Sequence, residues 1–265
     1  MRMMTLASGS SGNCIYIGSQ NTHILIDSGI TRKRIMEGLA KVNIKLSEIS
    51  AIFVTHEHSD HVKGLGVITR NDEIPIYCTN GTKEGICRLG GMGEIDESLL
   101  HTIAADNKYM VGDLCIHPFT VSHDAKEPVA YTVGCSGKKA GVVTDLGCYD
   151  DYIVQHMKGC HSILVEANYD VNLLQVGSYP YYLKQRILSN KGHLSNELCG
   201  RLIDTLLHKD ISNIILGHLS KENNYDKLAF ETVKCEIDLS ASDYKSNDFN
   251  ILVASRTTPS CMVDV

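Results

Sequence analysis

The residues of this sequence best suited to chemistry lie in the stretch Thr55–His61, which reads Thr-His-Glu-His-Ser-Asp-His. Imidazole and carboxylate groups are the ordinary ligands of divalent transition metals. If the chain stays extended past a strand, alternate side chains point to one side, so His56 and His58 can reach one ion. Asp60 and His61 then fall in the turn beyond, beside a neighbouring position. The spacing predicts a pair of metal ions about 3.5–4 Å apart, and the alternative interpretation is a surface cluster of histidines without a metal.

Strands that end at one edge of a sheet must position these ligands. The apolar, β-branched run Ala51–Val54 directly precedes the histidines and is typical of a buried strand. Later apolar runs that also read as strands each precede a possible ligand, and these ligands are His123, Asp145 and His218. A single histidine after a strand is often an ordinary polar residue, but the order and spacing of all of them favour a metal site.

The predicted ligands divide between two positions. The first position consists of three histidines, His56, His58 and His123. Asp145 has two carboxylate oxygens and can bridge both ions. The second position takes the remaining ligands, Asp60, His61 and His218. Nitrogen and oxygen ligands without thiolate suit Zn²⁺, Mn²⁺ or Fe²⁺, and ligand type alone does not choose among them.

The pattern HxHxDH after a hydrophobic strand resembles the signature of the metallo-β-lactamase fold. This resemblance implies an α/β protein built as an αββα sandwich, with the metals at one edge of its two sheets. Asp27, in the stretch Ile24–Gly29, matches the first motif of the family, whose aspartate supports the metal ligands; a simple turn residue is the alternative. Flavodiiron proteins share the fold but place a glutamate where His58 stands, which favours hydrolysis over redox chemistry.

A second pair of motifs indicates the class of substrate. Glu166 closes an apolar run that reads as a strand, and Lys191–Glu197 opens an apparent helix just after His193. Both resemble motifs of ribonuclease Z and related phosphodiesterases, in which a glutamate and histidine pair lies beside the metals with the histidine against the scissile phosphate. The alternative for His193 is a polar residue near a helix start, with Ser195 or Asn196 as the N-cap.

A closer resemblance covers nearly the whole chain and becomes indistinct after about Glu236. The opening Ala7–Asn13 and the stretch Glu166–Glu197 resemble the YycJ/WalJ family of metallo-β-lactamase-fold proteins. Members of this family act as 5′ to 3′ exonucleases on duplex DNA, with a role in DNA repair. The resemblance therefore implies DNA as the partner.

The resemblance also implies a mechanism in which a metal-bound hydroxide attacks phosphorus. Asp60 would orient the hydroxide, and His193, oriented by Glu166, would donate a proton to the leaving oxygen. Two alternatives stay open. One is a phosphodiesterase or other hydrolase that acts on small, for example cyclic, molecules, and the other is a metal-binding interaction protein without catalysis.

Candidate contacts to the substrate are weaker. Tyr179 lies in a stretch with further tyrosines and with Lys184 and Arg186, and such a mixture can stack on a base and hold phosphates. An amphipathic helix with packed tyrosines explains it equally well. Asn13, in a loop rich in glycine and serine, can donate to a phosphate, although a tight hairpin explains the same residues.

Composition favours one compact domain over residues 1–265, in which 237–265 supplies a closing strand of the second sheet and a frayed tail. The net charge of −6 argues against a broad basic surface that coats nucleic acid, but not against a nuclease. Ten cysteines without a CxxC pair indicate free thiols in a reducing compartment, so we expect a cytoplasmic protein. No apolar run approaches the roughly 18 residues of a membrane span.

Overall fold

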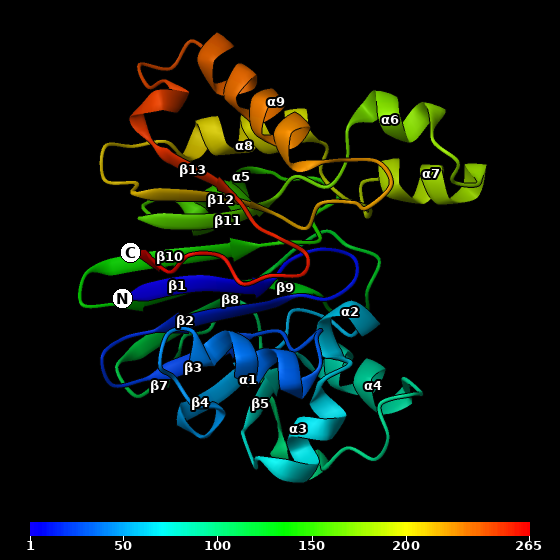
Figure 1. Ribbon diagram of the computed structural model, residues 1–265, viewed down its shortest axis with the longest axis vertical. Coiled ribbons are helices and arrows are strands. Elements are labelled where there is room, and N and C mark those ends of the chain that lie inside the picture. Colours follow the sequence, from blue (N-terminus) through cyan, green and yellow to red (C-terminus); the bar gives the residue numbers. More distant parts are fainter.

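Two β-sheets lie face to face, and helices cover the outer face of each (Figure 1). The computed structural model describes all residues, 1–265. In spatial order, the first sheet consists of β14 (Val263–Asp264), β1 (Arg2–Ala7), β2 (Cys14–Gly18), β3 (His23–Ile26), β4 (Ile49–Phe53), β5 (Ile76–Cys78) and β6 (Leu100–Thr102). The second sheet consists of β13 (Asn250–Val253), β12 (Asn213–Gly217), β11 (Ser162–Glu166), β10 (Lys138–Val143), β9 (Val129–Cys135), β8 (Leu114–Thr120) and β7 (Tyr109–Val111).

The helices fall into three groups. On the side of the first sheet lie α1 (Arg32–Ala40), α2 (Ser59–Val62), α3 (Leu65–Asn71) and α4 (Asn80–Arg88). The second sheet is covered by α5 (Asp151–Met157), α8 (Asn196–Leu206) and α9 (Asp226–Leu239). The short helices α6 (Val171–Val176) and α7 (Tyr181–Leu188) project beyond the two layers (Figure 1). No helix is both long and apolar enough to cross a bilayer.

The alternation of side chains along each strand explains why the layers form. In β2, Ile15 and Ile17 belong to the apolar cluster between the sheets, whereas Tyr16 between them packs into the cluster under α1 and α3. The second sheet does the same, since Leu164 of β11 faces the first sheet and its neighbour Val165 faces the helices. Each sheet is therefore buried on both faces. This arrangement confirms the expected αββα sandwich.

The carboxyl ends of the central strands meet at one edge of the sandwich. Strands β3 and β4 run parallel, as do β10, β11 and β12. The chain turns sharply where these strands end, and Asp27, Asp145 and His218 take positive φ angles of 62°, 58° and 53°. Such angles are uncommon for residues other than glycine, although Asp and His tolerate them better than most. Backbone strain of this kind gathers at functional sites.

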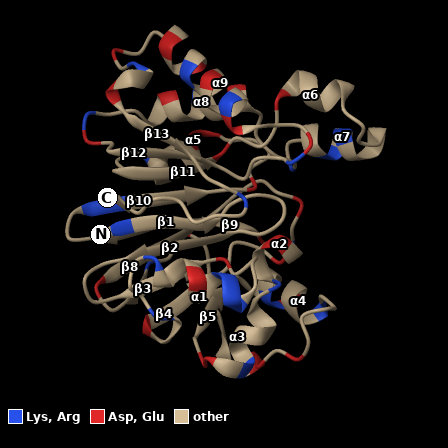
Figure 2. Cartoon of the chain, viewed as in Figure 1, with Lys and Arg blue, Asp and Glu red and all other residues tan.

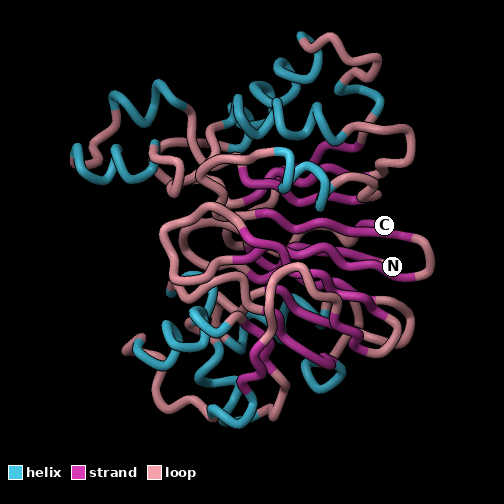
Figure 3. The backbone as a smooth tube through the Cα atoms, turned by 180° about the vertical axis from the view of Figure 1, so that it is seen from behind, coloured by secondary structure: helices cyan, strands magenta, loops and turns pink.

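The last part of the chain joins both sheets. Strand β13 extends the second sheet beside β12, and β14 pairs antiparallel with β1 in the first sheet. The Val265 N–H donates to the Met1 carbonyl at 2.9 Å, so the two termini lie side by side (Figures 1 and 3). The frayed tail is thus corrected to a paired strand. That residues 1–265 form a single domain stays a prediction.

Candidate metal centre

All the residues expected to bind metal come together at this edge. Asp60 and His61, which we expected in a turn, lie in the one-turn helix α2 that follows β4. The potential ligand atoms of the cluster form overlapping groups, and the atoms of each group lie within 4.8 Å of one another. The groups are His56 with His58 and His123, His56 with His61 and Asp145, Asp60 with His61 and His218, and Asp145 with Glu166, His193 and His218.

The three-histidine group has ring nitrogens free for coordination. His123 Nδ1 lies 3.0 Å from the Gly192 carbonyl oxygen and donates to it, which leaves Nε2 without a proton in the neutral ring. This Nε2 lies 3.3 Å from His58 Nδ1. The Nδ1 of His56 is 3.0 Å from the Thr55 hydroxyl, which leaves its Nε2 available for coordination. Hydrogen bonds of this kind fix the orientation of metal-binding histidines.

The second group surrounds Asp145. Its Oδ2 lies 3.2 Å from His61 Nε2, and its Oδ1 lies 3.5 Å from His218 Nε2 and 3.6 Å from His123 Nε2. Asp60 Oδ2 is 3.5 Å from both His61 Nε2 and His218 Nε2. Asp145 thus touches both histidine groups, as a bridging carboxylate requires.

Asp27 supports this group through hydrogen bonds to His61 and Thr55. The His61 Nδ1 donates to Asp27 Oδ2 at 2.7 Å, and the Thr55 N–H donates to Asp27 Oδ1 at 2.8 Å. Asp27 is fully buried. It is a turn residue at a strand end and it also bonds to His61, so the two interpretations from the sequence are compatible with each other.

Three buried polar atoms at the centre of the cluster make no well-aligned hydrogen bond. They are His56 Nε2, Asp145 Oδ2 and His218 Nε2. A buried polar atom without a partner costs about 1–3 kcal/mol. Because all three atoms can act as metal ligands and lie in one cluster, a cation bound there would give each of them a partner.

The electrostatics of the cluster also fit cations. Burial lowers the pKa of His56 well below its usual range, so its ring is neutral and able to coordinate. Burial opposes the charged form of His61 and His218 too, but neighbouring carboxylates, Asp145 first, raise the pKa of both, that of His218 to about 10. Protons on these two rings thus balance the buried carboxylates until divalent ions replace them. The donor set fits divalent metal ions.

Glu166 and His193 form a pair beside this cluster. Glu166 Oε1 accepts from the backbone N–H of Leu146 at 2.6 Å and of Leu194 at 3.0 Å. Its Oε2 lies 3.1 Å from His193 Nδ1 and 3.3 Å from His218 Nδ1. Burial opposes ionisation of Glu166, but His193 outweighs it and lowers the pKa of the carboxyl to about 2. His193 itself is partly exposed at the start of the turn that leads to α8, whose N-cap is Ser195, one of the two candidates.

Asn13 does not face a substrate. It is fully buried, its Oδ1 accepts from the Gly9 N–H at 2.8 Å, and its Nδ2 lies 3.0 Å from His61 Nε2. Its backbone N–H donates to the Asp60 carbonyl at 2.7 Å. Asn13 therefore ties the loop after β1 to the metal-binding loop, and the expected phosphate contact is corrected to a supporting role.

The other expected substrate contacts separate in the structure. Tyr179 packs against the apolar cluster of α6 and α7. The Lys184 ammonium donates to the Gln175 carbonyl at 2.7 Å, at the end of α6. Arg186 alone turns toward the metal ligands, where its guanidinium pairs with Asp124. The stretch is an amphipathic helix in part, and one of its basic residues reaches the site.

Three further residues contact the proposed metal ligands, although we did not expect this from the sequence. Asp124 Oδ1 lies 3.4 Å from His123 Nε2 and 3.9 Å from His58 Nε2. Asn168 Nδ2 donates to the His218 carbonyl at 2.7 Å, and Thr55 links Asp27 to His56. Asp124 and Thr55 directly adjoin ligands in sequence, which is the signal that indicates them.

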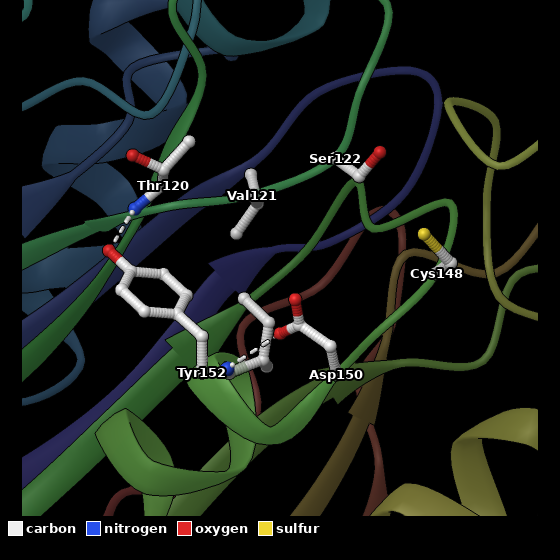
Figure 4. Close-up of a pocket in the computed structure, with 7 residues that line it drawn as sticks. Thr120, Val121, Ser122, Cys148, Asp150 and Tyr152 are labelled. Carbon is white, nitrogen blue, oxygen red and sulfur yellow. Dashed lines mark hydrogen bonds between the residues drawn. The ribbon is translucent and has the colours of Figure 1, made fainter.

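A pocket of about 320 Å³ lies between the segment at the end of β8 and the segment that leads into α5 (Figure 4). It is lined by Thr120, Val121, Ser122, Cys148, Asp150, Tyr152 and Ile153. Its polar groups bond to each other, since the Thr120 N–H donates to Tyr152 Oη at 3.2 Å and the Ile153 N–H donates to Asp150 Oδ1 at 3.1 Å. None of the residues expected to bind metal lines this pocket, so it is separate from the site expected from the sequence.

Comparisons with known proteins place these features in a family. Residues 22–218 match the family model described as "Beta-lactamase superfamily domain". The exodeoxyribonuclease WalJ of Streptococcus pneumoniae is 40% identical over 228 residues, which cover 86% of this chain and 85% of that protein. The exodeoxyribonuclease YycJ of Bacillus anthracis is 34% identical over 229 residues, which cover 86% of each.

Solved structures show the same fold at low identity. Zinc-bound PqqB from Methylobacterium extorquens matches with a TM-score of 0.70 and 14% identity over the full length of both chains. The short form of human tRNase Z matches with a TM-score of 0.63 and 15% identity over 98% of this chain and 99% of that chain.

Proposed function

The chain belongs to the β-lactamase superfamily and, within it, to the family of the exodeoxyribonucleases WalJ and YycJ, and on this premise we propose that it is a metal-dependent DNA exonuclease. The polarity carried over from the resemblance is 5′ to 3′ on duplex DNA. Removal of nucleotides from a DNA end is a step of DNA repair, which is the cellular role we propose.

The observation that carries the proposal is the position of His193. Its Nδ1 is held by Glu166 at 3.1 Å and lies 3.7 Å from Asp145 Oδ1, on the partly exposed side of the cluster. A histidine fixed through Nδ1 presents Nε2 outward, toward a phosphate bound at the metal ligands. This arrangement suits a general acid that protonates the leaving oxygen of a phosphodiester.

The ions, when bound, would polarise the phosphoryl oxygens and lower the pKa of water from 15.7 to about 7, which makes a nucleophile available at neutral pH. Asp60, partly exposed beside His61 and His218, orients the attacking hydroxide. His193 donates a proton to the leaving oxygen. The backbone N–H groups of Leu146 and Leu194 hold Glu166 Oε1, so that Oε2 stays directed at His193.

We propose two divalent ions per chain. They would be held by the residues expected from the sequence, which are His56, His58 and His123 for one ion, Asp60, His61 and His218 for the other, and Asp145 for both. The all-nitrogen and oxygen donor set suits Zn²⁺ or Mn²⁺, and Fe²⁺ also fits.

DNA is compatible with the acidic balance of the chain. Figure 2 shows acidic and basic residues interspersed over the elements. The formal charge of −6 omits bound ions, which supply local positive charge where the phosphate lies. An enzyme that holds one strand end needs few phosphate contacts, unlike a protein that coats DNA.

The cytoplasm is the compartment we propose. All ten cysteines are free, and three of them, Cys87, Cys235 and Cys261, are exposed. Exposed free thiols persist in a reducing environment.

The test is digestion of linear duplex DNA, labelled at the 5′ or at the 3′ end, by protein reconstituted with Mn²⁺ or Zn²⁺. Covalently closed circular duplex and the variant Asp60→Ala are the controls. We expect short products from linear DNA only, released first from the 5′ label, and none with Asp60→Ala. Hydrolysis of bis(p-nitrophenyl) phosphate with intact linear DNA would favour a small-molecule phosphodiesterase. Bound metal without turnover on either substrate would favour a metal-binding interaction protein.

A further inference from the structure

Helix α7 has two differently exposed sides. Leu183 and Ile187 pack toward α6 with Tyr179, while Tyr181 and Tyr182 leave 76% and 74% of their surface exposed. Tyrosine is enriched at binding surfaces because it combines a large apolar ring with a polar hydroxyl. Helix α7 lies on the side of the molecule where the metal-binding loops gather, and Figure 2 shows its basic residues (Figures 1 and 2).

The carboxyl end of α7 is fixed to the metal site. The Ser122 hydroxyl donates to the Asn190 carbonyl at 2.7 Å, and the Gly192 carbonyl accepts from His123. Arg186 pairs with Asp124, whose Oδ1 lies 3.4 Å from His123 Nε2. This end of the helix is therefore continuous with the site, and the end that begins at Tyr181 points away from it.

Helix geometry places Tyr182 in line with Arg186. The two are four residues apart, hence on one side of the helix and about 6 Å apart along its axis. That distance corresponds to one or two steps of a DNA strand at about 3.4 Å each. Tyr181, equally exposed, lies about 100° around the helix from Tyr182 and about 140° from Arg186.

We propose that Arg186 and Tyr182 form a subsite for the DNA strand next to the scissile phosphate, an inference that rests on the proposed function. Arg186 uses Nε and Nη2 for Asp124, so Nη1 is left to hold the neighbouring phosphate. Tyr182 stacks on the base that follows. Stacking on tyrosine tolerates any base, which suits an exonuclease that must process every sequence.

The experiment compares Tyr182→Ala with Tyr182→Phe and with the matched control Tyr181→Ala, all as full-length, metal-loaded protein. We measure kcat and KM for an end-labelled duplex and for bis(p-nitrophenyl) phosphate, which has no base to stack. Tyr182→Ala should raise KM for the duplex by roughly five- to 150-fold, the range of about 1–3 kcal/mol per stacked base. Tyr182→Phe and Tyr181→Ala should stay within about twofold of the unmodified protein, since both keep the Tyr182 ring.

Equal KM values for the duplex in Tyr182→Ala and Tyr181→Ala would overturn the subsite. A loss of the same size on bis(p-nitrophenyl) phosphate would also overturn it, because it would mean a disturbed metal site. A change of oligomeric state by light scattering, with unchanged duplex KM, would assign the surface to a second copy of the chain instead.

Failure of the proposed function would look different, since the unmodified protein would then leave linear DNA intact. In that case anisotropy of a fluorescent duplex decides the subsite. Equal affinity of the unmodified protein and Tyr182→Ala would overturn it, whereas weaker binding by Tyr182→Ala alone would support it.

Discussion

Glu166 Oε2 lies 3.1 Å from His193 Nδ1, and the opposite oxygen of Glu166 accepts two backbone N–H groups. The carboxylate cannot rotate without breaking these bonds, so it fixes the plane of the His193 ring. The same Oε2 lies 3.3 Å from His218 Nδ1. Glu166 thus orients both the proposed general acid and one metal ligand.

His193→Ala should lower kcat on linear DNA by about 10²–10⁴, the usual contribution of a general acid, with a smaller change in KM. The metal content, measured by mass spectrometry of the purified protein, should stay that of the unmodified enzyme. An equal loss in kcat and in substrate affinity would mean that His193 only positions the phosphate.

Glu166→Gln should have a double effect that His193→Ala lacks. Because Glu166 also orients His218, loss of its charge should weaken metal binding by about 10–100-fold in addition to lowering kcat. Titration of the metal-free protein with a competing chelator measures the affinity. An unchanged metal affinity would mean that Glu166 does not support metal binding through His218.

Asn13→Ala should act on metal binding and stability and not on DNA affinity. The side chain is fully buried and bonds to Gly9 and toward His61, and its loss leaves buried polar groups unpaired at about 1–3 kcal/mol. Thermal unfolding and chelator titration check this. A higher KM for DNA at normal metal affinity would instead support the phosphate contact that we expected from the sequence.

Gly29→Ala should damage the metal site through backbone contact. A Cβ at Gly29 would lie 1.6 Å from the Asp60 carbonyl oxygen, so the loop with Asp60 and His61 must move. We expect a stability loss of at least about 1–3 kcal/mol and loss of bound metal. Gly90→Ala is the matched control, because nothing lies within 4 Å of its added Cβ. If both variants kept metal and melting temperature, the close approach would be refuted.

Removal of the metal should lower the melting temperature. Partnerless atoms of His56, Asp145 and His218 meet in the cluster, and ligands that bind only the folded state stabilise it. A loss of each kcal/mol lowers the melting temperature by about 2–4 °C in a chain of this size. A chelated sample proven free of metal but with the same melting temperature would contradict this.

The clustering of the proposed metal ligands could be predicted from the sequence because their positions depend on local patterns. His56, His58 and His218 follow short apolar strands whose carboxyl ends meet at one edge, and that edge follows from the fold. Strand β14 escaped prediction, since two paired residues show no periodicity.

The substrate contacts could not be assigned in the same way. Lys184 and Arg186 are equivalent in the sequence, and only a pairing with Asp124, 62 residues away, separates them. Asn13 looks like a loop residue, and its burial depends on contact with Asp60, which is 47 residues away. Such long-range contacts leave no local pattern.

The most direct test of the account is digestion of end-labelled linear duplex as metal is added stepwise to metal-free protein, with bound metal measured in the same samples. The account predicts no turnover without metal and a rate that rises as the number of bound ions goes from one to two per chain. Intact DNA at two bound ions per folded chain, or full activity with one or none, would contradict it.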